Sequence, residues 1–301
     1  MNLHVLAIDL GGTKISGAIV NSDLGIVFES TVPSRDSIEG IADPNLNRTK
    51  ELIGSLCDFA RDNKILLSSG CAGFPEYVNL QGELTTRDNI DWGLQPQDDF
   101  KALTGFNWLA QSDVRCAGLA EATLGAGRNS QNFVYVTVSS GISHTHFLEG
   151  IAISGPNGEA IGFGLLEIEV SGKKVLLENY CSGLGIARRY AKEFGDFSID
   201  AKALLGLVEV DAKACGVVAS ATQVLGEELA KLALELETSA IVMGGGLWLG
   251  SQAYRELTMN SFHRACETLE NEAIVVNAEM RNSGVIGAAI YAFDADKSAK
   301  I

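Results

Sequence analysis

The sequence repeats one pattern: an apolar strand, a turn of small residues, and then two further strands. The first copy comprises residues 4–10, the turn Gly11-Gly12, residues 14–21 and residues 25–31. The second copy comprises residues 133–138, the turn Ser139-Ser140-Gly141, residues 142–149 and residues 151–153. Short turns between strands predict an antiparallel meander in each copy. A pattern that recurs this far along the chain predicts two halves of related architecture.

The rest of the chain reads as alternating helices and strands. Apolar residues at helical spacing predict helices at residues 45–63, 178–194 and 212–236, and apolar runs predict strands at residues 65–74 and 240–243. A last helix, residues 283–296, is expected to return to the first domain. We therefore predict a small domain of residues 1–113 plus 286–301 and a large domain of residues 114–285, with a cleft between them.

Composition narrows the classes of partner. The chain has 301 residues and a net charge of −15, so its surface repels a polyanionic backbone and nucleic acid is not an expected partner. The six cysteines form no CxxC pair, the start lacks the features of a signal peptide, and no apolar run reaches the ~18 residues of a membrane span. We expect a soluble, cytoplasmic protein with free thiols and no membrane partner.

Two glycine-rich turns have the chemistry of a nucleotide site. In Asp9-Leu10-Gly11-Gly12-Thr13-Lys14 the glycines let backbone amides approach a phosphate, Thr13 and Lys14 add donors, and Asp9 suits Mg²⁺, often through water. A plain hairpin turn is the alternative. Gly244-Gly245-Gly246 follows a strand and lets a flat base lie against the backbone, or else forms a flexible turn.

The first turn resembles the first phosphate motif of the ROK family of sugar kinases and repressors. Other stretches match that family in the same order: Asn89-Ile90-Asp91-Trp92, Ser112-Asp113-Val114-Arg115 with residues 120–128, Val138-Ser139-Ser140-Gly141-Ile142, Leu177-Glu178-Asn179-Tyr180-Cys181-Ser182-Gly183 and Val242-Met243-Gly244-Gly245-Gly246. Together these stretches cover most of the chain. The resemblance implies an α/β protein with the actin-like ATPase (ribonuclease H-like) fold, two domains with a central cleft, and a homodimer.

The resemblance also implies roles for single residues. ATP and Mg²⁺ would be the cofactors, with phosphate and adenosine contacts from Asp9, Gly11, Gly12, Thr13, Lys14, Ser139, Ser140, Gly141, Gly244, Gly245 and Gly246. Sugar contacts would come from Asn89, Ser112, Asp113, Glu159 and Glu178.

Asp113 is the predicted catalytic base, because phosphoryl transfer needs a carboxylate within hydrogen-bond reach of the attacking hydroxyl. A simpler role is open for three of these residues: Asp113 as a helix cap, Glu178 as a charge at a helix start, and Asn89 as a turn residue.

The sequence departs from the ROK pattern in its second half. It lacks the Cys-rich zinc motif and the ExGH segment of many members. No His follows Gly164, but Glu159 offers a carboxylate near the place of the Glu in that segment. His144 and His146 alternate on a strand, but a zinc site needs four ligands, so none is expected.

Ser112 and Arg115 stand where the family usually has Asn, and Ser-Ser-Gly replaces Gly-Thr-Gly. This combination is similar to a branch that includes kinases of amino sugars such as kanosamine.

The leading hypothesis is an ATP-dependent kinase of a hexose or amino-hexose, with Asp113 as general base. Because the sugar-contacting motifs have diverged, a catalytically impaired sugar- or nucleotide-binding protein with a regulatory role is the alternative. Direct repression is not expected, because the first strand begins within a few residues and no DNA-reading module fits before it. An actin-like ATPase that acts on no sugar is a third reading, which the Asp113 and Glu178 segments disfavour.

Overall fold

The computed structural model describes residues 3–35 and 43–298 and divides into two compact units. Unit 1 lies within Met1–Gly125, Ala152–Ala160 and Met280–Ile301, and unit 2 within Ala126–Ile151 and Ile161–Glu279. These limits differ from the predicted boundaries at residues 113 and 286. Helix α3 (Asp113–Thr123) belongs to unit 1 because it packs against α10 (Ser283–Ser298) in that unit's core.

A five-stranded sheet forms the frame of unit 1, in the order β3-β2-β1-β4-β5. Its strands are β1 (His4–Leu10), β2 (Lys14–Asn21), β3 (Ile26–Pro33), β4 (Leu67–Phe74) and β5 (Asn107–Ser112). β1 pairs antiparallel with β2 and parallel with β4, and β4 pairs parallel with β5. The carboxyl ends of β1, β4 and β5 therefore meet at one edge of the sheet, where ligands bind in many α/β proteins.

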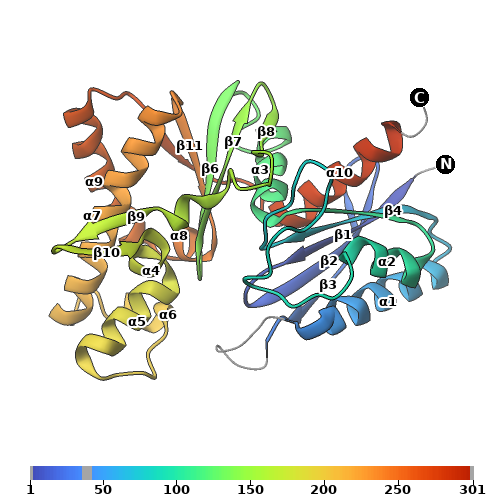
Figure 1. Cartoon of the computed structure of the whole chain (residues 1–301), viewed down its shortest axis with the longest axis horizontal. Helices are drawn as coiled ribbons and strands as arrows, with labels where there is room; N and C mark the ends of the chain where they lie inside the picture. The colour runs from blue at the N-terminus through green and yellow to red at the C-terminus, as the bar shows by residue number, and fades with distance from the viewer. Residues whose placement is uncertain (1–2, 36–42, 299–301) are drawn as a thin grey trace. The chain divides into compact units, whose positions relative to one another are not determined.

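Helices cover both faces of this sheet (Figure 1). Successive side chains of a strand point to opposite faces. Accordingly, Leu6 and Ile8 of β1 pack in one core with α1 (Asn47–Asp62) and α2 (Pro96–Thr104), whereas Val5 and Ala7 pack in another with α3 and α10. A short 3-10 helix, η1 (Pro44–Leu46), precedes α1. The near-continuous apolar run of β1 is thus explained by burial on both faces.

Unit 2 is built on a second sheet, in the order β12-β11-β6-β7-β8. Its strands are β6 (Asn132–Val138), β7 (Ile142–Leu148), β8 (Ile151–Ile153), β11 (Ala240–Gly244) and β12 (Ile274–Asn277). β6 pairs antiparallel with β7 and parallel with β11, which repeats the arrangement of β1 with β2 and β4. The predicted duplication is therefore present in the pairing of the strands.

The main core of unit 2 joins β6 and β11 to the long helices α7 (Ala212–Glu235) and α9 (Gln252–Leu269). The remaining elements of this part of the chain are η2 (Gly162–Leu165), β9 (Glu167–Val170), β10 (Lys173–Leu176), α4 (Leu177–Cys181), α5 (Gly183–Phe194), α6 (Ala201–Gly206) and α8 (Gly246–Gly250). In the described part of the chain, every helix is too short or too polar to span a membrane.

One predicted helix is divided in the structure. The sequence predicted a single helix at residues 178–194, but the backbone is extended at Ser182, between α4 and α5. The Ser182 hydroxyl accepts a hydrogen bond from the amide of Gly185, so this residue caps a new helix.

Candidate active site

The sheet of unit 1 brings Asp9 and Asp113 to the same glycine. Asp9 is near the end of β1, and its register partner on β4 is Gly73. A Cβ atom placed on Gly73 would lie 3.2 Å from the Cα of Asp113, at the start of α3. Residues that are distant in sequence thus become neighbours, because parallel strands end at a common edge.

Both carboxyl groups have raised pKa values, mainly because they are buried. Burial raises the pKa of Asp113 to about 8, and the negative charges of Asp9 and Glu76 add to the rise, which the amide of Val114 opposes. Burial also raises the pKa of Asp9 to about 6, against the opposing charge of Lys14. Buried carboxyl groups with raised pKa values are typical of sites that bind a proton or a cation.

Asp113 is the first residue of α3, and Ser112 occupies the N-cap position. The Oδ1 atom of Asp113 accepts a hydrogen bond of 2.7 Å from the amide of Val114, which fixes the carboxylate at the helix start. Ser112 therefore occupies the cap position that was suggested for Asp113, and Asp113 is the first residue inside the helix. The Ser112 side chain is fully buried, and its hydroxyl has no hydrogen-bond partner among the described residues.

The turn from β1 to β2 is a hairpin closed by a hydrogen bond of 2.9 Å from the amide of Gly11 to the carbonyl of Lys14. The side chains of Thr13 and Lys14 are exposed. The hairpin reading is therefore confirmed, and it leaves two donor side chains in water. The phosphate roles of Gly11, Gly12, Thr13 and Lys14 stay predictions.

A buried carboxylate that the sequence analysis did not single out organises the Asn89 loop. Glu76 is 2% exposed, and it accepts hydrogen bonds from the Thr86 hydroxyl and from the amides of Asp88, Asn89 and Ile90. The Asn89 side chain donates to the carbonyl of Pro75. Asn89 is thus held on both sides, at an exposed position in unit 1.

Glu159 lies in unit 1 with Asp113, although residues on both sides of its segment belong to unit 2. Its exposed carboxylate accepts a hydrogen bond of 2.8 Å from the amide of Asn157. A Cβ on Gly155 would lie 2.8 Å from the carboxyl carbon of Glu159, so the side chain folds back over its own turn.

In unit 2 the Ser139-Ser140-Gly141 turn is held by the start of α5. The amide of Ser139 donates to the carbonyl of Gly141 at 2.9 Å. The amides of Gly183 and Leu184 donate to the carbonyls of Ser139 and Ser140, at 2.8 and 3.3 Å. The helix start therefore fixes the backbone of the predicted phosphate turn.

Glu178 and the glycine triplet contact the same turn. The Oε2 atom of Glu178 is 3.5 Å from the amide nitrogen of Ile142. A Cβ on Gly245, whose φ is +91°, would lie 2.4 Å from the carbonyl oxygen of Val138. One on Gly246 would lie 3.6 Å from the hydroxyl oxygen of Ser139. The predicted residues of unit 2 are thus gathered around one turn.

His144 and His146 lie on β7 and have separate partners. His144 Nδ1 accepts a hydrogen bond of 3.2 Å from the amide of Phe163, and His146 Nε2 is 2.8 Å from Oδ1 of Asn132. Within residues 3–35 and 43–298, no three His, Cys, Asp or Glu side chains cluster closely enough to hold a metal ion.

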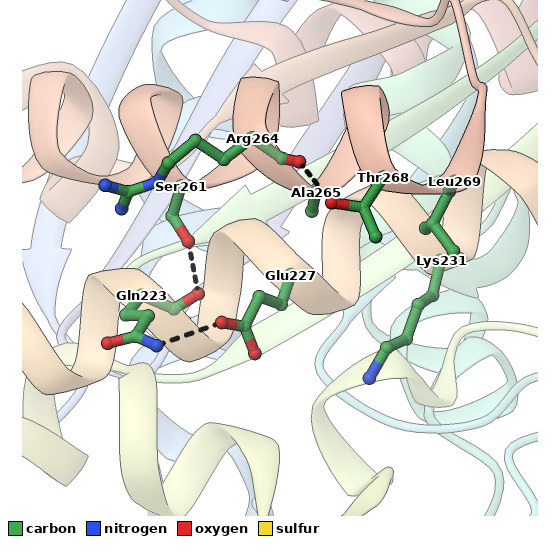
Figure 2. A pocket seen from close by; sticks show the side chains of 8 residues that line it. All are labelled: Gln223, Glu227, Lys231, Ser261, Arg264, Ala265, Thr268 and Leu269. Carbon is green, nitrogen blue, oxygen red and sulfur yellow. Dashed lines mark hydrogen bonds between the residues drawn. The ribbon is translucent and has the colours of Figure 1, made fainter.

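A groove of about 500 Å³ lies elsewhere on unit 2, between α7 and α9 (Figure 2). Its lining side chains are Gln223, Glu227, Lys231, Ser261, Arg264, Ala265, Thr268 and Leu269. Ser261 donates to the carbonyl of Gln223, and the Gln223 amide donates to Glu227. None of the predicted site residues lines this groove.

The sequence model of the ROK family matches residues 5–295, which is nearly the whole chain. The chain belongs to the ROK family. It is 26% identical to a glucokinase of Streptomyces coelicolor over 97% of this chain and 98% of that protein. It is 24% identical to an N-acetylmannosamine kinase of Escherichia fergusonii over 96% and 98% of the two chains.

The fold is that of solved ROK structures. A ROK glucokinase from Streptomyces griseus, crystallised with glucose and AMPPNP, superposes with a TM-score of 0.77 at 21% identity, over 97% of this chain and 99% of that one. The two-sheet α/β architecture is therefore the actin-like ATPase fold of the ROK kinases, as the sequence predicted.

Proposed function

We propose that this ROK protein is an ATP-dependent sugar kinase that phosphorylates a hydroxyl group of a hexose or amino-hexose. The observation that carries the proposal is the buried Asp113 carboxyl group beside Gly73 and Asp9, whose pKa is raised by burial first and by the charge of Asp9 second. The similarity to glucokinases and N-acetylmannosamine kinases supports sugar phosphorylation as the reaction class.

Asp113 would act as the general base. Its carboxylate takes the proton from the attacking sugar hydroxyl, whose oxygen bonds to the γ-phosphorus of ATP while the bond to the bridging oxygen breaks and ADP leaves. A carboxylate with a pKa of about 8 accepts a proton readily, which suits this step once Asp113 is ionised.

The residues around Asp9 fit Mg²⁺. Magnesium favours hard oxygen ligands and is usually held by one or two carboxylates together with substrate phosphates. Asp9 supplies such oxygens, and a cation beside it would offset the negative charge that Asp9 adds next to Asp113. Bound Mg²⁺ would neutralise part of the negative charge on the ATP phosphates.

Unit 2 would hold the nucleotide and part of the sugar. The turn at Ser139-Ser140-Gly141 has its backbone fixed by α5, which is the preorganisation that a phosphate contact needs. The backbone of Gly245 and Gly246, which packs against Val138 and Ser139, would contact the adenosine, and Glu178 offers a carboxylate to sugar hydroxyls.

A preference for amino-hexoses is part of the proposal. The ROK resemblance assigns Asp113, Glu159 and Glu178 to the sugar, and carboxylates form strong charge-assisted hydrogen bonds with an ammonium group. The similarity to an N-acetylmannosamine kinase supports a hexose with a nitrogen substituent, although the acetamido group of N-acetylmannosamine is neutral, so the ammonium preference rests on the carboxylates.

The test is ADP release from MgATP with a panel of hexoses, amino-hexoses and N-acetylhexosamines. We expect Asp113→Asn to lower kcat by about 10²- to 10⁴-fold while sugar binding, followed by calorimetry, persists. Asp62→Asn, at an exposed carboxylate of α1, is the control and keeps full turnover.

The outcomes separate this proposal from the regulatory alternative. Binding of a sugar by the unaltered protein without turnover would favour a sugar-binding regulator. Unchanged turnover in Asp113→Asn would show that Asp113 is not the base.

A further inference from the structure

Arg115 is a buried cation whose partners are mainly backbone carbonyls. It lies on α3, two residues after Asp113, and is 1% exposed. Its guanidinium donates to Gly158 at 2.7 Å, Val78 at 2.8 Å and Ser154 at 3.1 Å, all at carbonyl oxygens. The amide oxygen of Gln111 accepts a fourth bond of 3.0 Å. The planar fork of an Arg can serve such divergent acceptors, which a compact ammonium cannot.

These bonds hold a turn that carries Glu159. The turn comprises residues 154–160, and the amide of Ala160 closes it by donating to the carbonyl of Ser154 at 3.0 Å. The same carbonyl accepts from Arg115. Glu159 lies between Gly158 and Ala160, one residue from an Arg115 contact. Arg115 therefore ties both ends of this turn to the helix that begins at Asp113.

The turn also packs closely on the Val78 backbone. Gly158 has a φ of +84°, and a Cβ there would lie 2.2 Å from the carbonyl oxygen of Val78. The Thr85 hydroxyl adds a bond of 3.0 Å to the carbonyl of Asn157. Arg115 bonds the Val78 carbonyl as well, so one side chain joins α3, the backbone at Val78 and the turn.

We propose that Arg115 is a positioning residue for sugar binding, which acts by fixing the residue 154–160 turn so that Glu159 faces the substrate at a set place relative to Asp113. This inference rests on the proposed kinase function. Loss of Arg115 removes a charged donor from the carbonyl oxygens of Gly158, Val78 and Ser154, so the turn loosens. A loose turn weakens contact with the sugar and leaves the nucleotide residues of unit 2 unchanged.

Kinetic constants test the proposal. We expect Arg115→Gln to raise KM for the sugar about tenfold or more, with KM for ATP within about twofold of the unaltered enzyme. Arg115→Lys keeps the charge and should recover part of the loss. Gly158→Ala keeps Arg115 but displaces the turn, and should raise the sugar KM in the same way. Gly172→Ala is the control, since Gly172 has a φ of +74° and open space around its Cα.

A double-mutant cycle tests whether Arg115 acts through Glu159. Glu159→Gln should raise the sugar KM in the unaltered enzyme and have little further effect in the Arg115→Gln background. Independent, additive effects would overturn the proposal, as would equal rises in the KM values of sugar and ATP.

Hydrogen exchange separates this inference from the proposed function, because it needs no activity. The amides of Gly158 and Ala160 should lose protection in Arg115→Gln, while those of the β9–β10 hairpin keep it. Full protection in the variant would overturn the positioning role even in an active kinase. Loss of protection in a protein that turns over no sugar would leave Arg115 as the turn's anchor and refute the kinase function alone. If Arg115→Gln does not fold, Gly158→Ala and Arg115→Lys carry the same comparisons.

Discussion

The carboxylate of Asp9 lies against the Cα of Gly284, in the first turn of α10. A Cβ on Gly284 would lie 2.4 Å from both Cγ and Oδ2 of Asp9. These distances are far inside van der Waals contact, so any side chain at this position must move the carboxylate. The last helix of the chain thereby sets where the β1 carboxylate can be.

The first prediction follows from this contact. Gly284→Ala should displace Asp9 and lower kcat/KM for MgATP by about tenfold or more, since small misplacements of a metal-binding carboxylate are costly. Gly54→Ala is the matched control on α1, where nothing lies within 4 Å of the added methyl group. The control should be neutral or more stable by about 0.5–1 kcal/mol. Equal kinetics for both variants would contradict the contact.

The second prediction concerns stability and pH in metal-free, nucleotide-free protein. Native Asp113 has a pKa of about 8 against 3.8 for an unperturbed Asp, so between these values the native state binds more protons than the unfolded chain. The unfolding free energy contributed by this group therefore falls as pH rises. Asp113→Asn removes the effect and should be more stable at pH 8, by on the order of 1–2 kcal/mol.

Urea unfolding at several pH values measures this difference. The curve of Asp113→Asn should be flatter between pH 4 and pH 8 than that of the unaltered protein, while Asp62→Asn keeps the original slope. A destabilised Asp113→Asn at pH 8 would show that its carboxylate is ionised and well stabilised in the fold.

The third prediction concerns Glu76. The Glu76 carboxylate accepts hydrogen bonds from three backbone amides of the loop. In Glu76→Gln one of the two oxygens becomes an NH₂ group, which cannot accept, so at least one buried donor loses its partner. We expect a loss of about 1–3 kcal/mol in unfolding free energy and a higher KM for the sugar, with KM for ATP unchanged. Glu51→Gln, at an exposed position of α1, is the control. An unaltered KM for the sugar would show that the Asn89 loop does not contribute to substrate binding.

The fourth prediction addresses the glycine triplet. Gly245→Ala forces a methyl group toward the Val138 carbonyl at a φ that L residues avoid. KM for ATP should rise by about tenfold, with the sugar Kd retained. Gly195→Ala, at a φ of +80° with open space, imposes the backbone strain without the collision. A rise of the same size in that control would assign the effect to strain alone.

Local patterns were enough to predict much of the fold. The apolar runs of β1 and β6 are buried on both faces, and the small-residue turns after them allow the antiparallel pairing of each meander. These features depend on residues close in sequence, so periodicity reveals them. The pairing of Asp9 with Asp113 depends on parallel strand order, and only the resemblance to the ROK family pointed to it.

Buried charges explain most of what the sequence could not predict. Arg115 and Glu76 bond mainly to backbone carbonyls and amides. Because every residue has a backbone, the identities of the partner residues give no indication in the sequence that these bonds form. The short strand at residues 151–153 was correctly predicted. Residues Ala152–Ala160 belong to unit 1. This assignment could not be predicted, because it depends on contacts with residues far away in the sequence.

The position of α10 has a consequence for biosynthesis. One face of the unit 1 sheet, including Val5, Ala7, Ala18 and Val20, is packed by α10, which the ribosome makes after all of unit 2. During translation only α3 can cover part of that apolar face until α10 is made, and exposed sheet faces favour aggregation and chaperone binding. Stalled chains that stop before Met280 should therefore associate with chaperones more than chains that include α10.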